Sequence, residues 1–213
     1  MFDNNWENII YKKNKQINKY PYDWIVSNTH RFITKKSKCL ELGSGVGNNI
    51  NFLLDFGFRN VDSLEASKTA VKIQRKKLIK KNVKIYNSDF NIFDYKKNNY
   101  NLVIDRVSLT HNKIHDIKNT IKKILISLKK DGYFFSIMFS KRSSFYKRQK
   151  QNSFFFQKEI NNKKGILTNF FSKDDILELF KNFKIINLTH ETRQTFVPNN
   201  KKLCNWNIIC KKK

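Results

Sequence analysis

Residues 39–49 read CLELGSGVGNN, and they join a short apolar run to glycines at alternate positions, Gly43, Gly45 and Gly47. A single acid, Glu41, lies inside the apolar run just before the first glycine. Glycines behind a buried strand let a ligand approach the backbone closely, and the N-terminus of a following helix offers unpaired N–H groups. The stretch therefore predicts a strand, a ligand-binding loop and a helix in direct succession.

Strands and helices alternate along the chain around this loop. Short apolar runs predict strands at residues 38–42, 61–66, 83–89, 100–107 and 133–139. Apolar residues three or four positions apart predict helices at residues 48–57, 67–81 and 113–129. Such alternation produces a parallel sheet covered by helices on both faces, so the sequence predicts an α/β fold.

The C-terminal part of the chain follows a different pattern. Ser172 followed by Asp175 is an acidic variant of the capping box, which predicts the start of a helix. Residues 183–190 and 203–211 predict two further strands, and the segment between them is too short for a crossover helix. We therefore expect these two strands to pair antiparallel as a hairpin.

The net charge is strongly positive, with 43 Lys and Arg against 17 Asp and Glu, or +26. A charge of this size suggests nucleic acid or an anionic membrane surface as a partner. However, the lysines are spread along the chain and accompany abundant Asn, Ile, Phe and Tyr, which share A- and T-rich codons. A functional basic surface and compositional drift both remain open.

Cysteine usage and the chain's apolar segments bear on its compartment. The three cysteines, Cys39, Cys204 and Cys210, fall in predicted strands and lack metal-ligand spacing, which is typical of buried thiols in a reducing compartment. The N-terminal segment lacks the apolar core of a signal peptide. The run at 133–139 is too short to cross a bilayer. We expect a cytoplasmic protein with no metal site and no transmembrane segment.

The spacing of the glycines indicates which ligand the loop binds. The dinucleotide fingerprint is G-x-G-x-x-G, whereas this loop is G-x-G-x-G, so its third glycine comes one residue early. Glu41 would also place a carboxylate near a polyanionic pyrophosphate. An acid at this position suits a ligand with a cationic part, such as an ammonium or a sulfonium group.

The pattern E-x-G-x-G-x-G resembles motif I of the class I S-adenosylmethionine-dependent methyltransferases, and the similarity continues in register over residues 38–139. Residues 100–111 resemble strand four and its loop, and residues 128–137 resemble a later motif, with Lys130 and Asp131 in place of Pro-Gly. The resemblance implies a Rossmann-like, seven-stranded, mostly parallel sheet of order 3-2-1-4-5-7-6 with strand seven antiparallel. It also implies S-adenosyl-L-methionine as cofactor and S-adenosyl-L-homocysteine as product.

The resemblance further implies a set of cofactor-binding residues. Glu65 falls where the family places the acid that binds both ribose hydroxyls, and Asp89 matches the adenine-contacting acid, with Phe90 beside it. Asp105 and Arg106 end strand four, where an ion pair, a cap or contact with the methionine moiety all remain open. The residues expected at the cofactor are Glu41, Gly43, Ser44, Gly45, Gly47, Asn48, Glu65, Ala66, Asp89, Phe90, Asp105 and Arg106.

We therefore expect a single methyltransferase domain in four parts. These parts are an N-terminal helical cap (1–37), a cofactor-binding core (38–139), a substrate-side insertion or lid (140–171) and a closing helix with a hairpin (172–213). The aromatic residues of the cap and of the insertion are candidates for the acceptor pocket. In the insertion these are Phe145, Tyr146, Phe154, Phe155 and Phe156, which ordinary packing under a long loop would also explain.

His111 is the candidate catalytic residue, on the loop after strand four. An unperturbed histidine titrates near neutral pH, so His111 could act as a general base, with a rate that rises through one ionisation near neutrality. A purely structural role remains open.

The sequence narrows the methyl acceptor without fixing it. The chain carries DRVS at residues 105–108 where methylators of adenine N6 carry an N/D-P-P-Y/F tetrad. The expected reaction is methyl transfer to O or N of a small metabolite or of a surface-glycan or lipid precursor. The alternatives are an RNA methyltransferase, suggested by the charge, and a cofactor-binding protein without turnover.

Overall fold

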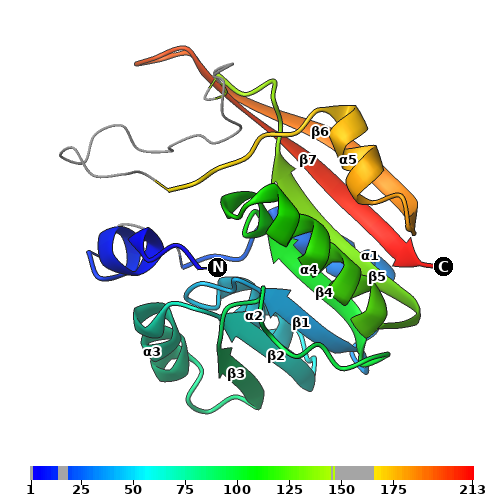
Figure 1. Ribbon diagram of the computed structural model, residues 1–213. Helices are drawn as coiled ribbons and strands as arrows, with labels where there is room; N and C mark the ends of the chain where they lie inside the picture. The colour runs from blue at the N-terminus through cyan, green and yellow to red at the C-terminus, as the bar shows by residue number, and fades with distance from the viewer. Residues whose placement is uncertain (1, 14–18, 145, 147–165) are drawn as a thin grey trace.

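The computed structural model of this 213-residue chain describes residues 2–13, 19–144, 146 and 166–213. At its centre lies one seven-stranded sheet with the strand order β3-β2-β1-β4-β5-β7-β6 (Figure 1). The strands are β1 (Lys38–Leu42), β2 (Asn60–Glu65), β3 (Val83–Asn87), β4 (Tyr100–Arg106), β5 (Leu128–Phe139), β6 (Phe183–Thr195) and β7 (Lys201–Lys212). The helices are η1 (Trp6–Tyr11), α1 (Asp23–Phe32), α2 (Asn48–Asp55), α3 (Lys68–Lys77), η2 (Leu109–His111), α4 (Ile114–Ser127) and α5 (Lys173–Leu179).

The strand pairing gives the sheet a parallel body and an antiparallel edge. β1 pairs parallel with β2 and β4, and the pairs β2–β3 and β4–β5 are parallel as well. β7 pairs antiparallel with both β5 and β6. The predicted sheet order and the antiparallel closing hairpin are therefore confirmed.

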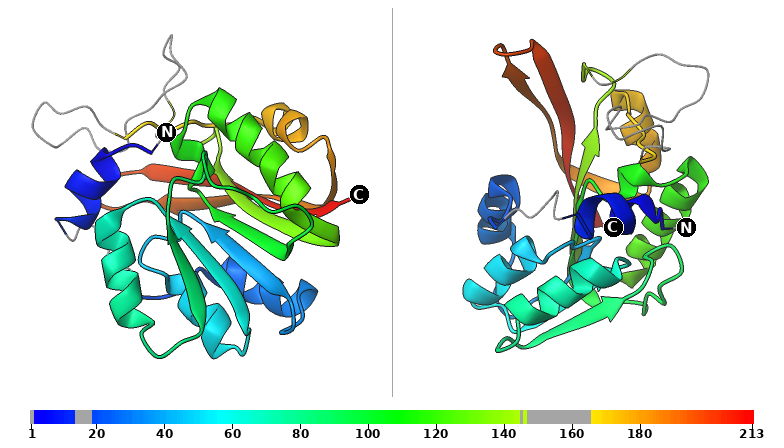
Figure 2. Two further views of the ribbon diagram at one scale, coloured as in Figure 1. Left: turned by 60° about the horizontal axis from the view of Figure 1, so that its bottom comes forward. Right: turned by 90° about the vertical axis from the view of Figure 1, so that its left-hand side faces the viewer.

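The closing hairpin is longer than the sequence predicts. β6 continues to Thr195 and β7 begins at Lys201, so both strands pass the expected boundaries at residues 190 and 203. Each residue from Glu191 to Thr195 pairs with a residue of β7. The hairpin projects beyond the neighbouring strands (Figures 1 and 2), because two strands can satisfy each other's backbone groups without a third. This extension adds side chains of β6 and β7 to the carboxyl edge of the parallel strands.

β5 also begins earlier than the predicted strand at residues 133–139. It starts at Leu128, and its pairing with β4 shifts register between Tyr100 and Leu102. Asp131 lies within this irregular stretch with φ of 62°. The bulge lets the chain remain in the sheet where the sequence suggests a turn. The preceding helix α4 correspondingly ends at Ser127 instead of residue 129.

Helices cover both faces of the sheet (Figure 2), and each face has its own hydrophobic cluster. On one face, Ile117 of α4 and Ile176 of α5 are completely buried against the sheet. On the other face, Ile25 of α1 and Leu53 of α2 are completely buried. The apolar stripes that predicted these helices are therefore the surfaces that hold them to the strands.

Two local predictions agree with the structure. Ser172 Oγ accepts the N–H of Asp175, and the Asp175 carboxylate accepts the N–H of Ser172, so the predicted capping box starts α5. Cys39 of β1, together with Cys204 and Cys210 of β7, is a free and buried thiol. The strand positions of all three cysteines are thus as predicted.

The segments at the two flanks of the core are described to different extents. The predicted N-terminal cap contains η1 and α1. Of the predicted insertion at 140–171, the structure describes residues 140–144, 146 and 166–171. Phe145 and the phenylalanines at 154–156 lie outside the described residues.

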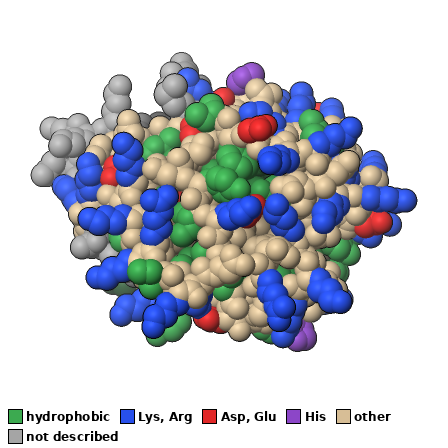
Figure 3. Space-filling model, turned by 90° about the horizontal axis from the view of Figure 1, so that it is seen from below, with side chains coloured by type: hydrophobic (Ala, Val, Ile, Leu, Met, Phe, Trp, Pro, Cys, Tyr) green, Lys and Arg blue, Asp and Glu red, His purple; other side chains and the backbone are tan. Residues whose placement is uncertain are grey.

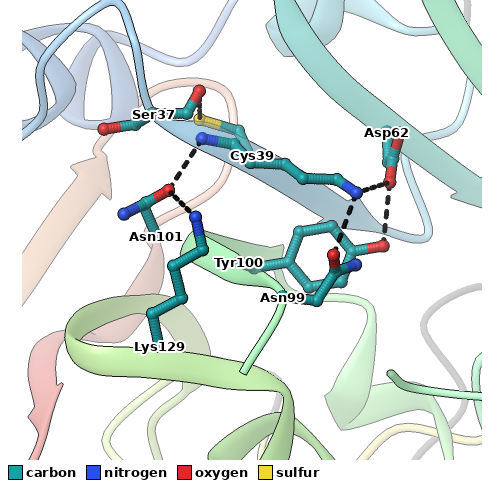
Figure 4. A network of polar contacts seen from close by, with 8 residues as sticks. Ser37, Cys39, Asp62, Asn99, Tyr100, Asn101 and Lys129 are labelled. Carbon is teal, nitrogen blue, oxygen red and sulfur yellow. Dashed lines mark hydrogen bonds and ion pairs between the residues drawn. The ribbon is translucent and has the colours of Figure 1, made fainter. Parts of the chain in front are cut away.

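A polar network holds the amino ends of the strands together (Figure 4). Lys38 Nζ donates to Asn99 Oδ1 at 3.0 Å and lies 3.8 Å from the Asp62 carboxylate. Tyr100 donates its hydroxyl proton to the same carboxylate at 2.9 Å, and Asn101 Oδ1 accepts the N–H of Lys38 at 3.0 Å. These contacts join β1, β2 and β4 at the edge opposite the glycine loop. The carboxyl edge is therefore the one left open to a ligand.

Candidate active site

The loop between β1 and α2 requires glycine both because of its backbone conformation and because of its close packing. Gly43 and Gly47 both have positive φ, at 53° and 74°. A Cβ on Gly43 would lie 2.3 Å from Ser108 Oγ, and a Cβ on Gly47 would lie 2.6 Å from Gln74 Cγ. Any larger residue would therefore be strained and would collide with the loop after β4 or with α3. The glycines allow the loop to pass between these two elements.

One cavity of about 470 Å³ extends along the carboxyl edge of the sheet from this loop. Its lining follows the order of the strands, from Asp89 after β3, through Glu65 of β2 and Glu41 of β1, to Arg106 of β4 and Phe139 of β5. The volume falls within the range of small-molecule sites. The cavity therefore lies where open α/β sheets bind their ligands.

Most of the predicted cofactor residues meet in this cavity. The predicted residues that line it are Glu41, Gly43, Ser44, Gly45, Asn48, Glu65, Ala66, Asp89, Phe90 and Arg106. Two predicted residues are not part of the lining. Gly47 is the N-cap of α2 and packs against α3. Asp105 is completely buried beneath the loop after β4.

Asp105 shapes this loop from below. Its carboxylate accepts the N–H of Leu109 at 3.0 Å and the hydroxyl proton of Ser136 at 2.9 Å. Burial raises the pKa of Asp105 to about 7, although both hydrogen bonds oppose that rise. These contacts favour the capping role that the sequence left open for Asp105, because they hold the start of η2.

Glu41 is a buried acid with an unused oxygen. It is 2% exposed, and its Oε1 accepts a hydrogen bond from Asn49 Nδ2 at 2.6 Å. Oε2 has no hydrogen-bond partner among the described residues. Burial raises the pKa of Glu41 to about 8. An unpaired carboxylate oxygen in a buried site is costly unless a partner arrives, so Glu41 fits a ligand that carries a positive charge.

Glu65 connects the end of β2 to the glycine loop and to α3. Its two carboxylate oxygens accept the N–H groups of Gly45 at 2.8 Å and Ser67 at 2.7 Å. Burial raises its pKa, against the lowering effect of these N–H donors. Each carboxylate oxygen accepts more than one hydrogen bond, so the arrangement is compatible with further hydroxyl donors from a ligand.

Asp89, which follows β3, lies at the end of the cavity farthest from the β6–β7 hairpin. Its Oδ2 accepts the N–H of Phe2 at 2.5 Å, and its Oδ1 accepts the N–H of Asn91 at 2.9 Å. The N-terminal segment therefore reaches the position that the family resemblance gives to adenine. Phe90, the neighbour of Asp89, is held by the Tyr95 hydroxyl, which donates to its carbonyl at 3.0 Å.

The N-terminal segment is fixed over the cavity by an acid that the sequence analysis did not identify. Glu7 of η1 accepts the Ser67 hydroxyl proton at 2.5 Å, the Thr69 hydroxyl proton at 2.6 Å and the Thr69 N–H at 3.2 Å. These donors lie at the start of α3. The neighbouring aromatic residues Trp6 and Tyr11 line the cavity. No local signal marks Glu7, because its partners lie about sixty positions away.

His111 lines the cavity, and its imidazole ring is held by packing and by a hydrogen bond. Its ring packs edge-on against Trp6 and Phe139, with centroids 4.9 and 6.0 Å apart. Its Nδ1 lies 2.9 Å from the Leu167 carbonyl, which can only accept, so Nδ1–H is the donor and Nε2 the acceptor. Burial lowers the pKa of His111 to about 4. This value lies below the neutral range in which the sequence analysis expects His111 to ionise, so we now expect a neutral imidazole at pH 7.

The far end of the cavity is built by the hairpin, which the sequence analysis did not link to the site. Glu191, Arg193, Leu203 and Asn205 of β6 and β7 line it. Glu191 and Arg193 lie in the part of β6 beyond the predicted strand, so no sequence pattern placed them in the sheet. The long antiparallel pairing alone brings them to the carboxyl edge.

The fold and cavity define a Rossmann-like α/β protein with a cofactor site at the carboxyl edge of its sheet. The family described as a methyltransferase domain matches residues 16–186, and the chain belongs to this family. It is a class I methyltransferase, and S-adenosylmethionine is its cofactor. The unpaired oxygen of Glu41 beside the glycine loop suits the positive charge of this cofactor.

Solved structures share the fold at low sequence identity. A methyltransferase from Methanosarcina mazei has a TM-score of 0.75 at 14% identity, covering 91% of this chain and 98% of that one. A methyltransferase from Anabaena variabilis has a TM-score of 0.70 at 20% identity, covering 98% and 93%. The Burkholderia thailandensis 1,6-didemethyltoxoflavin-N1-methyltransferase, with its acceptor and S-adenosylhomocysteine bound, has a TM-score of 0.70 at 14% identity, covering 95% and 84%.

Three further findings concern relatives, membrane-spanning helices and metal sites. A search among curated proteins gave no significant match. Within the described ranges, no helix is both long and apolar enough to span a membrane. The same part of the chain contains no group of three or more His, Cys, Asp and Glu side chains suited to a metal ion.

Replacing Glu65 by alanine is expected to weaken cofactor binding. A carboxylate that accepts two hydroxyl protons makes two charge-assisted hydrogen bonds, each worth on the order of 1.5–3 kcal/mol. Together they amount to on the order of 3–6 kcal/mol, so their loss corresponds to roughly 10²–10⁴-fold in the dissociation constant, measured by calorimetry with S-adenosylhomocysteine. Glu65→Gln keeps one acceptor oxygen and should lose less. An unchanged dissociation constant in Glu65→Ala would remove Glu65 from the site.

Replacing Glu7 by alanine is expected to loosen the segment over the cavity. The variant loses hydrogen bonds to Ser67 and Thr69, and we expect S-adenosylhomocysteine to bind about tenfold or more weakly. Glu178→Ala is the matched control, because Glu178 is an exposed acid of α5 outside the cavity lining. Equal affinity in Glu7→Ala and Glu178→Ala would show that the clamp does not support binding.

Proposed function

We propose that the protein transfers the methyl group of S-adenosylmethionine to an oxygen or nitrogen of a small molecule. The observation that carries the proposal is that His111, whose Nδ1 is held by the Leu167 carbonyl so that Nε2 is left as an acceptor, lines the same cavity as Glu41 and Glu65. S-adenosylmethionine supplies an activated methyl group, so the protein needs mainly to orient the acceptor and to remove its proton.

The cofactor half of the cavity is proposed to lie over β3, β2 and β1. Asp89 and Glu65 would hold the adenine and ribose parts, and Glu41 would face the positively charged part. The loop from Gly43 to Gly45 would lie against the cofactor backbone-first, since it presents no side chain larger than that of Ser44. The division of the chain into a cap (1–37), a cofactor-binding core (38–139), an insertion (140–171) and a closing part (172–213) also stays a proposal.

The acceptor half is proposed to lie over β4, β5 and the hairpin. His111 Nε2 would accept the proton of the acceptor, because Nδ1–H is engaged with the Leu167 carbonyl. The aromatic rings of Trp6 and Phe139 pack on His111 and leave it half-buried in the cavity. A neutral base of low pKa removes a proton only in concert with methyl transfer, since it cannot fully deprotonate an alcohol or amine beforehand.

The RNA methyltransferase alternative lacks a specific supporting observation. Lys and Arg side chains are spread over the face seen in Figure 3 and do not gather on one part of it. The cavity has the volume of a small-molecule site. Nucleic-acid binding through scattered lysines would weaken steeply with salt, so undetectable binding to mixed RNA at low salt would rule this alternative out.

The proposed activity is tested with the purified protein, isotopically labelled S-adenosylmethionine and the small-molecule fraction of a bacterial extract. We expect untargeted mass spectrometry to detect at least one labelled product whose added methyl group is on O or N. A product labelled on carbon or sulfur would contradict the proposed chemistry. Cofactor binding without any labelled product would favour a binding protein without turnover.

His111→Ala is expected to lower turnover by about 10²–10⁴-fold while donor affinity stays nearly unchanged, because a general base contributes this much. Since burial lowers the pKa of His111 to about 4, the wild-type rate should not rise through a histidine ionisation between pH 6 and 8. It should fall only as the pH approaches 4 and Nε2 is protonated. His115, an exposed residue of α4, provides the control. Full turnover in His111→Ala would make His111 structural.

A further inference from the structure

The acceptor half of the cavity ends at one acid, Glu191, which lies outside the proposed cofactor half. The other acids lining the cavity are Asp3, Glu41, Glu65 and Asp89, and all of them belong to the N-terminal segment or to the β1–β3 side. Glu191 belongs to β6, at the opposite edge of the sheet. Glu191 is therefore too far from the proposed cofactor half to be assigned to the cofactor.

Strand pairing places Glu191 in line with the proposed base. Phe139, which packs against the His111 ring, is paired with Asn205 across β5 and β7. Asn205 in turn is paired with Glu191 across β7 and β6. Two strand spacings separate Glu191 from Phe139, which corresponds to about 10 Å between backbones. Glu191 and the Phe139 residue that packs on the proposed base therefore lie two strands apart at the same edge of the sheet.

Two hydrogen bonds fix the Glu191 carboxylate. Its Oε2 accepts the Tyr22 hydroxyl proton at 3.1 Å and a hydrogen bond from Asn207 Nδ2 at 2.9 Å. Burial and the neighbouring Glu191 raise the pKa of Tyr22 to about 12, so Tyr22 keeps its proton and stays a donor. Both donors act on the same oxygen. They hold the carboxylate in one orientation before any acceptor arrives.

The other carboxylate oxygen keeps its hydrogen-bonding capacity. Among the described residues, the nearest ion-pair contact of Glu191 Oε1 is Arg193, at 4.0 Å, which is beyond hydrogen-bonding distance. The Glu191 side chain is one-third exposed, so a molecule in the cavity can reach it. Arg106 also lines this part of the cavity, with its guanidinium 5.1 Å from the centre of the Tyr22 ring. Arg193 next to this acid and Arg106 next to its partner Tyr22 favour a neutral hydrogen-bond donor over a cationic one.

We infer that Glu191 is a specificity-determining residue for the methyl acceptor, whose Oε1 accepts a hydrogen bond from an O–H or N–H group that is not methylated. The acceptor is then a neutral small molecule with at least two O–H or N–H groups, one directed to His111 and one to Glu191. This inference rests on the proposed function. It adds the chemical class of the acceptor and a residue that selects it.

The experiment uses the full chain, labelled S-adenosylmethionine and the small-molecule fraction of a bacterial extract, followed by kinetics on the acceptor that wild type labels most. Glu191→Ala should raise the KM for this acceptor about tenfold to a hundredfold, with little change in kcat, because a hydrogen bond to a charged group is lost. Glu191→Gln keeps one acceptor oxygen and should restore part of the affinity. Glu178→Ala, which removes an exposed acid on α5, should behave as wild type.

A second arm separates recognition from folding. Calorimetry with S-adenosylhomocysteine should give the same dissociation constant for wild type and Glu191→Ala, which shows that the variant is folded with an intact cofactor site. An acceptor analogue with its second O–H or N–H group methylated should lose as much in wild type as Glu191→Ala loses with the true acceptor. The two losses should not add when variant and analogue are combined.

Several results would overturn the inference. An unchanged KM in Glu191→Ala, or additive losses with the analogue, would show that Glu191 does not contact the acceptor. A labelled acceptor with a single O–H or N–H group would contradict the proposed class, while leaving the methyl-transfer activity intact. If wild type labels nothing in the extract, the proposed function fails and the inference fails with it.

Discussion

The Glu65 carboxylate is the interaction on which the rest of the site depends. It accepts the N–H of Gly45 from the glycine loop and the N–H of Ser67 from the start of α3. Ser67 in turn donates its hydroxyl proton to Glu7, which fixes the N-terminal segment above the cavity. One buried acid thus connects the central strands, the ligand loop and the cover of the site. Burial makes its charge costly, and the two N–H donors offset part of that cost.

The sheet order explains why one cavity can serve two ligands. Strands β2 and β3 are added on one side of β1, and β4 and the later strands are added on its other side. The cavity therefore has β2 and β3 on one side and β5, β7 and β6 on the other. Buried acids dominate the first side, whereas the second combines aromatic rings, arginines and a single acid, Glu191. His111 lies beside β5, between these two environments. This division follows from topology and strand pairing, and it gives a physical basis for assigning a donor half and an acceptor half.

Much of the fold could be predicted from the sequence, because it is encoded in local patterns. Apolar periodicity and the glycine loop gave the strand and helix sequence, and the Ser172–Asp175 capping box started α5 as expected. The cofactor residues on the glycine loop and at the ends of β2 and β3 came from motif spacing and resemblance, and most of them line the cavity. Asp105 does not, because a motif places a residue along the chain without fixing the direction of its side chain, and Gly47 does not, because it packs against α3.

The sequence by itself determined the class of fold, the glycine loop and the acids beside it, since each depends on neighbouring residues and on strand ends that a parallel sheet brings together. Only the tertiary structure decided the surroundings of His111, whose ring packs on Trp6 and Phe139 and whose Nδ1 donates to the Leu167 carbonyl. It also decided the clamp by Glu7 and the position of Glu191, whose partners lie far away in sequence. Burial and long-range pairing set these features, and neither is a property of a local stretch of chain.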